Sequence, residues 1–145
     1  MIEIPPRVLD SGNASGGLES GPRFLPNIVK MEPRFAALER IDVGAVADSV
    51  TDQWYNETLC EVDDHLVRLG VLRGEYHWHS HEDQDEFFYV VDGKLLIELE
   101  GHPTVELSPR QGLTVPKGLR HRPIAPDRTI VLMIEKAGVV PSGDV

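Results

Sequence analysis

The sequence predicts an all-β domain of the sandwich or barrel class. Beyond Trp54 the chain consists of short apolar runs separated by Gly, Pro and Asp, which is the pattern of closely spaced strands and tight turns. No helical period there is long enough to alternate with these strands, so an α/β fold is not expected. The length of 145 residues suits one domain, and because we find no internal repeat we expect one barrel per chain.

The N-terminal segment differs in composition from the rest of the chain. Residues 1–30 include DSGNASGGLESGP, which is rich in Gly and Ser and has almost nothing to bury, so we expect a flexible arm followed by a domain at 31–145. The helix-like spacing of apolar residues in PRFAALERI predicts one or two helical turns over 33–41. Segment 47–54, ADSVTDQW, is predicted to be a loop.

Turn chemistry marks the ends of the predicted strands. Asp63-Asp64 is a turn, Gly74 ends the strand that follows it, and Asp92-Gly93 is a strong signal for a β-hairpin. The strands are expected at 58–62, 65–73, 75–81, 86–91, 94–100, 104–107, 112–115, 121–125 and 129–136.

Composition and charge argue against several classes of partner. The formal net charge of −10, from 14 basic and 24 acidic residues, is unfavourable for binding a nucleic-acid backbone or an anionic membrane. No apolar run approaches the ~20 residues of a membrane span, and MIEIPPRVLD is not a secretory signal, so a cytoplasmic location is expected. Cys60 is the only cysteine, which precludes an internal disulfide, and we expect it to be a buried structural thiol.

A histidine-rich segment carries the clearest chemical signal. Side chains two residues apart on a strand share a face, so His79 and His81 project together and can share one ion. His77 has the same parity and is an alternative third ligand. A carboxylate from the next strand would add an oxygen ligand, and imidazole with carboxylate suits Mn, Fe, Co, Ni or Zn. The competing interpretation is a surface strand of histidines with no ligand role.

A second segment, GLTVPKGLRH at 112–121, contains a Val-Pro-Lys-Gly turn that ends one strand and starts the next. A histidine directly after a turn, such as His121, is by itself more often structural or exposed than a ligand. Its significance comes from its pairing with the first segment.

Both segments resemble the cupin family. HSHEDQDEFFYVVDG at 79–93 fits the pattern H-x-H-x(3,4)-E-x(6)-G, and PKGLRH at 116–121 fits P-x-G-x-x-H. With GEYHWHSHEDQDEFF, VPKGLRHRPIA and PSGD, the chain looks most similar to small single-domain cupins labelled mannose-6-phosphate-isomerase-like. The resemblance runs from about Gln53 to Asp144 and implies a cupin double-stranded β-helix, an RmlC-like jelly-roll barrel, in the domain expected at 31–145. It also implies the metal ligands His79, His81, Glu86 and His121.

The resemblance implies chemistry on a small metabolite at one divalent transition metal per chain. Isomerase, lyase and dioxygenase reactions all occur on this fold, so a metal-dependent enzyme of one of these types is the first hypothesis. No organic cofactor is indicated and the catalytic residues stay unassigned. The alternative is a non-catalytic module in which the metal captures a ligand or stabilises the fold.

Three further expectations concern the dimer surface and the pocket. We expect a homodimer, because the apolar strands at 94–100 and 129–135 exceed what one small barrel can hide. Trp54 is expected to cap the pocket or the dimer surface. The pocket lining is expected among Tyr76, Trp78, Phe88, Tyr89, Arg122 and Met133.

Overall fold

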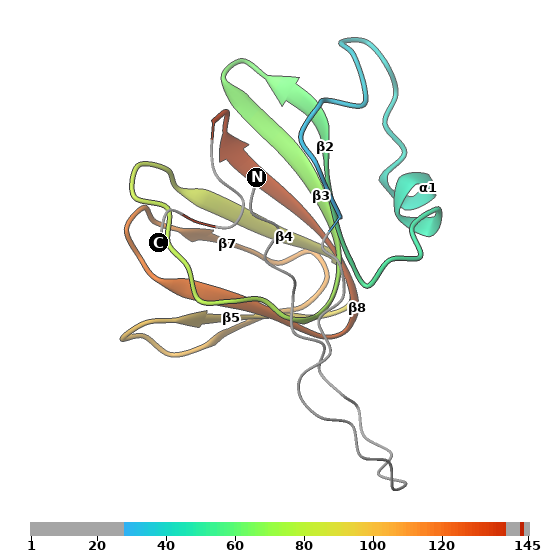
Figure 1. The fold of residues 1–145 in the computed structure, drawn as a ribbon. Helices are drawn as coiled ribbons and strands as arrows, with labels where there is room; N and C mark the ends of the chain where they lie inside the picture. Colours follow the sequence, from blue (N-terminus) through green and yellow to red (C-terminus); the bar gives the residue numbers. More distant parts are fainter. Residues whose placement is uncertain (1–27, 139–142, 144–145) are drawn as a thin grey trace, which may run out of the picture.

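The computed structural model describes residues 28–138 and Gly143, and this part of the chain is built mainly from β-strands (Figure 1). The predicted all-β class is therefore confirmed. Most of the predicted arm at 1–30 lies outside the described residues. The last three residues of the arm form a strand that pairs in parallel with residues 55–57. The boundary at residue 30 stays a prediction. The strands are β1 (Ile28–Lys30), β2 (Trp54–Val62), β3 (His65–Glu75), β4 (Glu86–Asp92), β5 (Leu95–Leu99), β6 (Val105–Leu107), β7 (Gly112–Val115) and β8 (His121–Lys136).

The longest strand, β8, organises the sheet. In the order β1-β2-β3-β8-β4-β7, β8 pairs antiparallel with β3 along nearly its whole length. On its other edge, residues 121–124 of β8 pair with β5, and residues 130–135 pair with β4. Because β8 pairs along one edge first with β5 and then with β4, the sheet curls on itself. Figure 1 shows this curl, from β2 and β3 at the top to β5 at the bottom. The two strands predicted at 121–125 and 129–136 are thus one.

The Asp92-Gly93 turn is present, but it does not close the predicted β-hairpin. Gly93 has φ +88°, and the next N–H, that of Lys94, donates to Thr129 Oγ1 over 3.1 Å. Within the described chain, β4 and β5 on either side of this turn both pair with β8 rather than with each other. The Asp-Gly signal reports the backbone conformation of the turn, whereas the long strand β8 decides the pairing.

The helix predicted over 33–41 is wrong in position. Here the chain follows β2 instead, since the Phe35 N–H donates to the Leu59 carbonyl over 2.9 Å. The helix forms one segment later, as α1 (Val43–Asp48). Its first turn is capped because the Asp42 side chain accepts a hydrogen bond from the Ala45 N–H over 2.9 Å. No helix within the described residues is long and apolar enough to cross a membrane.

Two apolar clusters lie on opposite faces of the sheet. Alternation along β2 directs Trp54 into the barrel interior and Tyr55 to the outer face. Helix α1 covers the outer face with Val46 and Ala47. The loop predicted at 47–54 is therefore wrong for its first two residues, which end α1, and for Trp54, which starts β2. The inner cluster forms the barrel core around the site and comprises Trp54, Leu72, Tyr76, Phe88, Val90, Leu95, Ile97, Leu107, Val115, Ala125, Val131 and Met133.

Candidate metal centre

Four side chains converge inside the barrel. Each offers one ligand atom, and these atoms all lie within 4.8 Å of one another. No member is more than 6% exposed, which contradicts the alternative of a histidine-bearing surface strand. We call this group the His/Glu cluster: it consists of His79, His81, Glu86 and His121. The structure thus brings together all four residues that the cupin resemblance assigns.

The cluster is assembled from the starts of two strands and the loop between β3 and β4. Glu86 is the first residue of β4, and His121 is the first residue of β8. His79 forms an isolated bridge with His121 rather than part of a regular strand. The strand predicted at 75–81 is therefore wrong for its greater part, because β3 ends at the first residue of that range. The rings of His79 and His81 nevertheless lie together, with centroids 5.2 Å apart.

Contacts to the carboxylate and to backbone carbonyls orient the rings. Glu86 Oε2 lies 3.2 Å from His81 Nε2 and 3.3 Å from His121 Nε2. The Nδ1 atoms of His79 and His121 each lie 2.9 Å from the carbonyl oxygen two residues earlier. A carbonyl only accepts, so Nδ1 carries a proton in both rings. In the neutral ring of His79 this leaves the Nε2 lone pair for the cluster, whereas Nε2 of His121 faces the Glu86 carboxylate. His81 Nε2 does not meet hydrogen-bond geometry with Glu86 despite the distance of 3.2 Å, and His81 Nδ1 has no hydrogen-bond partner within the described chain.

Electrostatics favour neutral imidazole and ionised carboxylate at this position. Burial and, after it, the neighbouring His121 lower the pKa of His79 to about 4, so His79 is neutral at pH 7. Burial alone raises the pKa of Glu86, but its contacts with His121 and His81 outweigh burial and hold that pKa below its ordinary value. A buried carboxylate beside neutral imidazole is a donor set that suits a divalent cation.

His77, the alternative third histidine, lies outside the His/Glu cluster. Its ring packs beside Tyr76, with centroids 4.2 Å apart, and lies 5.3 Å from the ring of His79. Its carbonyl oxygen is the acceptor that orients His79. The structure therefore favours His79 in the ligand position and gives His77 a positioning role through its main chain.

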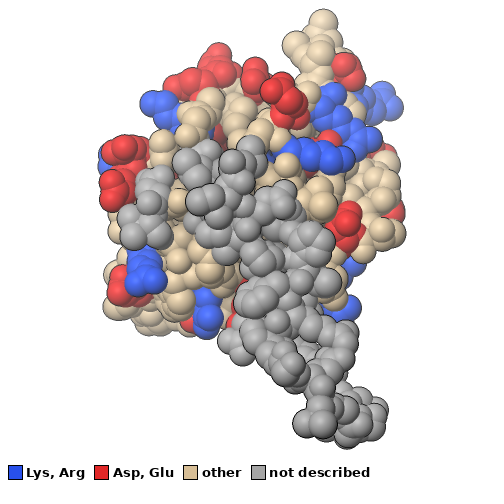
Figure 2. All heavy atoms as spheres, viewed as in Figure 1, with Lys and Arg blue, Asp and Glu red and all other residues tan. Residues whose placement is uncertain are grey.

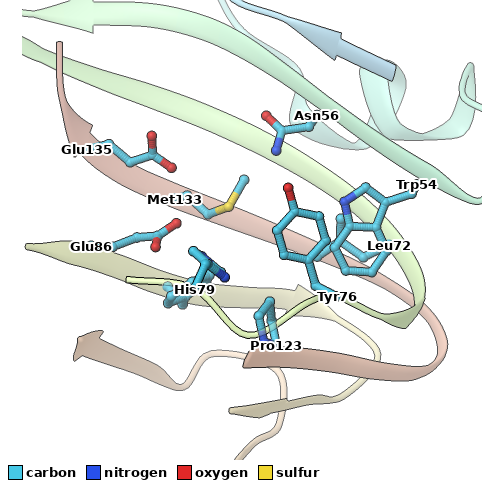
Figure 3. Close-up of a pocket in the computed structure, with 10 residues that line it drawn as sticks. Trp54, Asn56, Leu72, Tyr76, His79, Glu86, Pro123, Met133 and Glu135 are labelled. Atoms are coloured by element: carbon cyan, nitrogen blue, oxygen red, sulfur yellow. The ribbon is translucent and has the colours of Figure 1, made fainter. Parts of the chain in front are cut away.

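A cavity lies beside the cluster (Figure 3). Its volume of about 30 Å³ gives room for roughly two water molecules. On the side away from Glu86, Trp54 and Tyr76 stack with ring centroids 5.1 Å apart and planes 10° from parallel. The lining consists of Trp54, Asn56, Leu72, Tyr76, His79, Glu86, Phe88, Pro123, Met133 and Glu135.

Part of the predicted lining is confirmed. Tyr76, Phe88 and Met133 line this cavity, and so does Trp54, which was expected to cap either the pocket or a dimer surface. Three further predicted residues do not line it. The Arg122 guanidinium makes two hydrogen bonds to Glu98, at 3.0 and 3.1 Å, and lies 5.3 Å from the centre of the Trp78 ring. The residues absent from the lining are Trp78, Tyr89 and Arg122.

Two buried charged residues beside the cluster were missed by sequence reasoning. Arg68 is 0% exposed and Glu135 is 3% exposed. Glu135 is the cross-strand neighbour of Glu86. Burial and, after it, the charge of Glu86 raise the pKa of Glu135 to about 8, and Arg68 opposes this shift. Alternation along TIVLMIE puts Glu135 on the same strand face as Met133, and this parity is the signal that could have identified it.

The C-terminal PSGD motif also reaches the site. Gly143 has φ +86°, and a Cβ atom there would lie only 2.5 Å from the Cβ of His79 and 3.0 Å from the Ser80 carbonyl oxygen. A side chain at this position is excluded both by its backbone conformation and by the approach to His79. The remainder of the motif lies outside the described residues.

Comparisons with known proteins agree with this geometry. The sequence profile of the cupin domain matches residues 66–135. The chain is 43% identical over 91 residues to YdbB of Bacillus subtilis (strain 168), a match that covers 63% of this chain and 80% of YdbB. It is 46% identical over 95 residues to the polyketide synthase CurC of Streptomyces cyaneus, covering 64% of this chain and 61% of CurC. The chain thus spans less than two thirds of CurC.

Solved structures share the fold. A cupin-2 domain containing protein from Shewanella frigidimarina matches with a TM-score of 0.63 and 28% identity, covering 66% of this chain and 93% of that one. NMB1881 from Neisseria meningitidis has the same fold, with a TM-score of 0.62 and 22% identity over 68% of this chain and 100% of that one. On its sequence match, its jelly-roll sheet and its relatives, the chain belongs to the cupin family.

Proposed function

We propose that the protein is a metal-binding cupin that holds one divalent transition metal per chain through the His/Glu cluster and binds a small molecule at that metal. The observation that carries this proposal is the convergence of four buried ligand atoms within 4.8 Å. The Nε2 lone pair of His79 supports it, because the His77 carbonyl holds the opposite ring nitrogen in the protonated form. This nitrogen and oxygen donor set suits Mn, Fe, Ni, Co or Zn.

The residues fit a divalent cation in a further respect. The ionised Glu86 carboxylate is surrounded by His79, His81 and His121, and buried charge of one sign is costly without a counterion. His81 also keeps both ring nitrogens without a hydrogen-bond partner in the described chain. A cation within the cluster would satisfy both groups at once.

We propose further that the site is enzymatic, of isomerase, lyase or dioxygenase type. A bound divalent metal supplies Lewis-acid polarisation of a coordinated oxygen. The chain supplies a cavity lined in part by the aromatic side chains of Trp54, Tyr76 and Phe88. The buried ionisable side chains of Arg68 and Glu135 favour an enzyme over a purely structural metal site, since such groups cost stability and are typical of functional sites. A non-catalytic module would bind the same ligand without turnover.

A phosphorylated sugar is not the favoured ligand. Recognition of a phosphate group relies on Arg or Lys side chains or on a helix N-terminus. No Lys or Arg is part of the cavity lining found among residues 28–138. The resemblance to mannose-6-phosphate-isomerase-like cupins therefore stays a prediction about which group of cupins the chain resembles, and we do not extend it to a sugar-phosphate substrate.

The test is metal binding by the purified chain and by two histidine variants. Wild type should take up about one divalent ion, and His81→Ala should weaken binding by at least about tenfold. His102→Ala is the matched control, because His102 is exposed and outside the cluster; it should bind like wild type. Wild type that takes up none of Mn, Fe, Co, Ni or Zn would refute the proposal, as would a Glu86→Ala variant with full occupancy.

The expected homodimer, the cytoplasmic location and the absence of nucleic-acid or membrane partners stay predictions. Val62 and Ile134 are exposed apolar residues on strands β2 and β8, which supports a surface covered by a second copy. On the face seen in Figure 2, acidic and basic side chains of the described residues are interspersed. Gel filtration should give the mass of a dimer, and a monomer mass would contradict the first expectation.

A further inference from the structure

The connection between β7 and β8 contains a tight turn at residues 116–119, which we call the Pro-Gly turn. It closes through its own backbone, because the Leu119 N–H donates to the Pro116 carbonyl over 3.2 Å. Gly118 has φ +81°, which is typical of the third residue of a type II turn. The N–H groups of the two central residues, Lys117 and Gly118, are not used by the closing hydrogen bond and can donate elsewhere.

Both of these N–H groups donate to the loop between β3 and β4. The Gly118 N–H donates to the His81 carbonyl over 2.8 Å. The Lys117 N–H donates to Asp85 Oδ1 over 2.9 Å. These two hydrogen bonds, which we call the turn clamp, hold both ends of the short connection between His81 and Glu86.

His81 is the histidine of the His/Glu cluster whose ring has the least support. A carbonyl oxygen two residues earlier lies 2.9 Å from Nδ1 of His79, and the same holds for His121. The ring nitrogens of His81 form no hydrogen bond within the described chain. The direction of its ring therefore depends on the position of its backbone, and the turn clamp fixes that backbone through the carbonyl.

Asp85 supplies the side-chain half of the turn clamp. It is exposed, and it directly precedes Glu86. The cross-strand neighbour of Glu86 is Val115, which directly precedes the Pro-Gly turn. The register between β4 and β7 thus brings the Asp85 carboxylate to the Lys117 N–H.

We propose that Asp85 is a positioning residue that raises the metal affinity of the site, because its hydrogen bond to the Pro-Gly turn holds His81 and Glu86 in place for one ion. A loop without this bond samples more conformations before the ion binds, and the entropy of ordering it opposes binding. This inference rests on the proposed metal site. It adds a residue outside the His/Glu cluster that controls how tightly the site binds.

The first test is the Co²⁺ affinity of folded variants, measured by competition with a chelator. Asp85→Ala should bind about fivefold more weakly than wild type, the effect expected for one hydrogen bond. Asp85→Asn keeps an Oδ1 acceptor and removes only the charge, so it should stay within about twofold of wild type. Asp83→Ala is the matched control, because Asp83 is exposed in the same loop and has no hydrogen bond to the described part of the turn. It should also stay within about twofold.

The donor can be removed independently of Asp85. Lys117→Pro deletes the N–H, and proline is favoured at the second position of a type II turn. This variant should lose about as much Co²⁺ affinity as Asp85→Ala, and it should lose little more when the two changes are combined, since both break the same bond. Fully additive losses, about 25-fold in the double variant, would show that the two residues do not act through one bond.

The turn clamp is also measurable without metal. In chelator-treated protein the Lys117 amide is exposed, so its exchange with solvent should be slower in wild type and Asp85→Asn than in Asp85→Ala. Equal exchange in all three proteins would overturn the inference, as would Asp85→Ala with wild-type affinity or Asp85→Asn as weak as Asp85→Ala. Each of these results leaves the metal site standing.

Wild type that protects the Lys117 amide but binds no metal would instead overturn the proposed function, and with it the role of the clamp in metal binding. Circular dichroism and urea unfolding show which variants fold. Lys117→Pro carries the affinity test if Asp85→Ala does not fold.

Discussion

His79 and His121 each donate a backbone N–H to the carbonyl of the other, over 3.0 and 2.9 Å, and their rings lie with centroids 4.4 Å apart. The pairing fastens the loop that follows β3 to the first residue of β8. Two histidines from distant parts of the sequence are thereby held in place by the backbone itself. A site held this way loses little conformational freedom when an ion binds.

The protonation state of His79 should be visible without any metal. Because burial and His121 lower its pKa to about 4, His79 in chelator-treated protein should stay neutral from pH 7 to pH 5. The hydrogen bond to the His77 carbonyl requires the proton on Nδ1. Long-range ¹⁵N NMR of the imidazoles reports both properties. A titration midpoint near the ordinary 6.5, or a proton on Nε2, would contradict this account of the ring.

Replacement of Gly143 should disturb His79. A Cβ at residue 143 would lie 2.5 Å from the His79 Cβ, so Gly143→Ala should weaken metal binding by about tenfold. Gly138→Ala is the control, because Gly138 has a similar φ of +89° but open space around its missing Cβ. Metal titration of both variants separates the steric contact from backbone strain. Equal affinities in the two variants would show that the contact with His79 does not matter.

Glu135 should give the apo protein a pH-dependent stability. Its pKa is raised from 4.5 in the unfolded chain to about 8 in the folded protein. The contribution of this shift to the free energy of unfolding is therefore complete below about pH 4.5 and is lost as pH rises through 8. Wild type should therefore lose about 3 kcal/mol of unfolding free energy relative to Glu135→Gln between pH 5 and pH 8. His79 has the opposite dependence, but it is present in both proteins and cancels. Urea unfolding with chelator at the two pH values measures the difference, and parallel profiles would be inconsistent with a raised Glu135 pKa.

The turn at Gly93 should tolerate no side chain. A Cβ there would lie 2.6 Å from Thr129 Oγ1 and 2.8 Å from the Arg128 carbonyl oxygen, in a backbone with φ +88°. Gly93→Ala should lower the free energy of unfolding by about 3 kcal/mol. Gly101→Ala, at φ +74° in open space, should cost only about 1 kcal/mol. Similar losses in the two variants, measured by denaturant unfolding, would mean that the closeness to Thr129 has no energetic consequence.

The features predictable from sequence were those encoded locally. Asp63-Asp64 and Gly93 lie at turns because few residues accept their backbone conformations, and the short apolar runs between such turns are strands. The short helix was misplaced because its position depends on the cap at Asp42 and on packing against the outer face of the sheet, rather than on apolar spacing alone. The pairing of β4 and β5 with β8 is a long-range choice that no local signal contains.

The candidate site also combines residues that a local motif identifies with residues that only long-range strand pairing brings together. The spacing of His79, His81 and Glu86 within one segment made these residues recognisable, and His121 followed from the second motif. Parity along TIVLMIE could place Glu135 on the strand face of Met133, but its position opposite Glu86 depends on the register between β4 and β8. Residues that meet by strand pairing cannot be matched from one sequence, because a shift of one residue in register would turn them to the other face.

The central claim is that His79, His81, Glu86 and His121 bind one metal ion, and X-ray absorption at the metal edge tests it most directly. In the metal-loaded protein the first shell should contain three imidazole nitrogens and at least one oxygen, at about 2.0–2.2 Å for zinc. His121→Ala should lose one imidazole from that shell, whereas exposed His102→Ala should not. A first shell with fewer than three imidazoles in wild type, or one unchanged by His121→Ala, would contradict the claim.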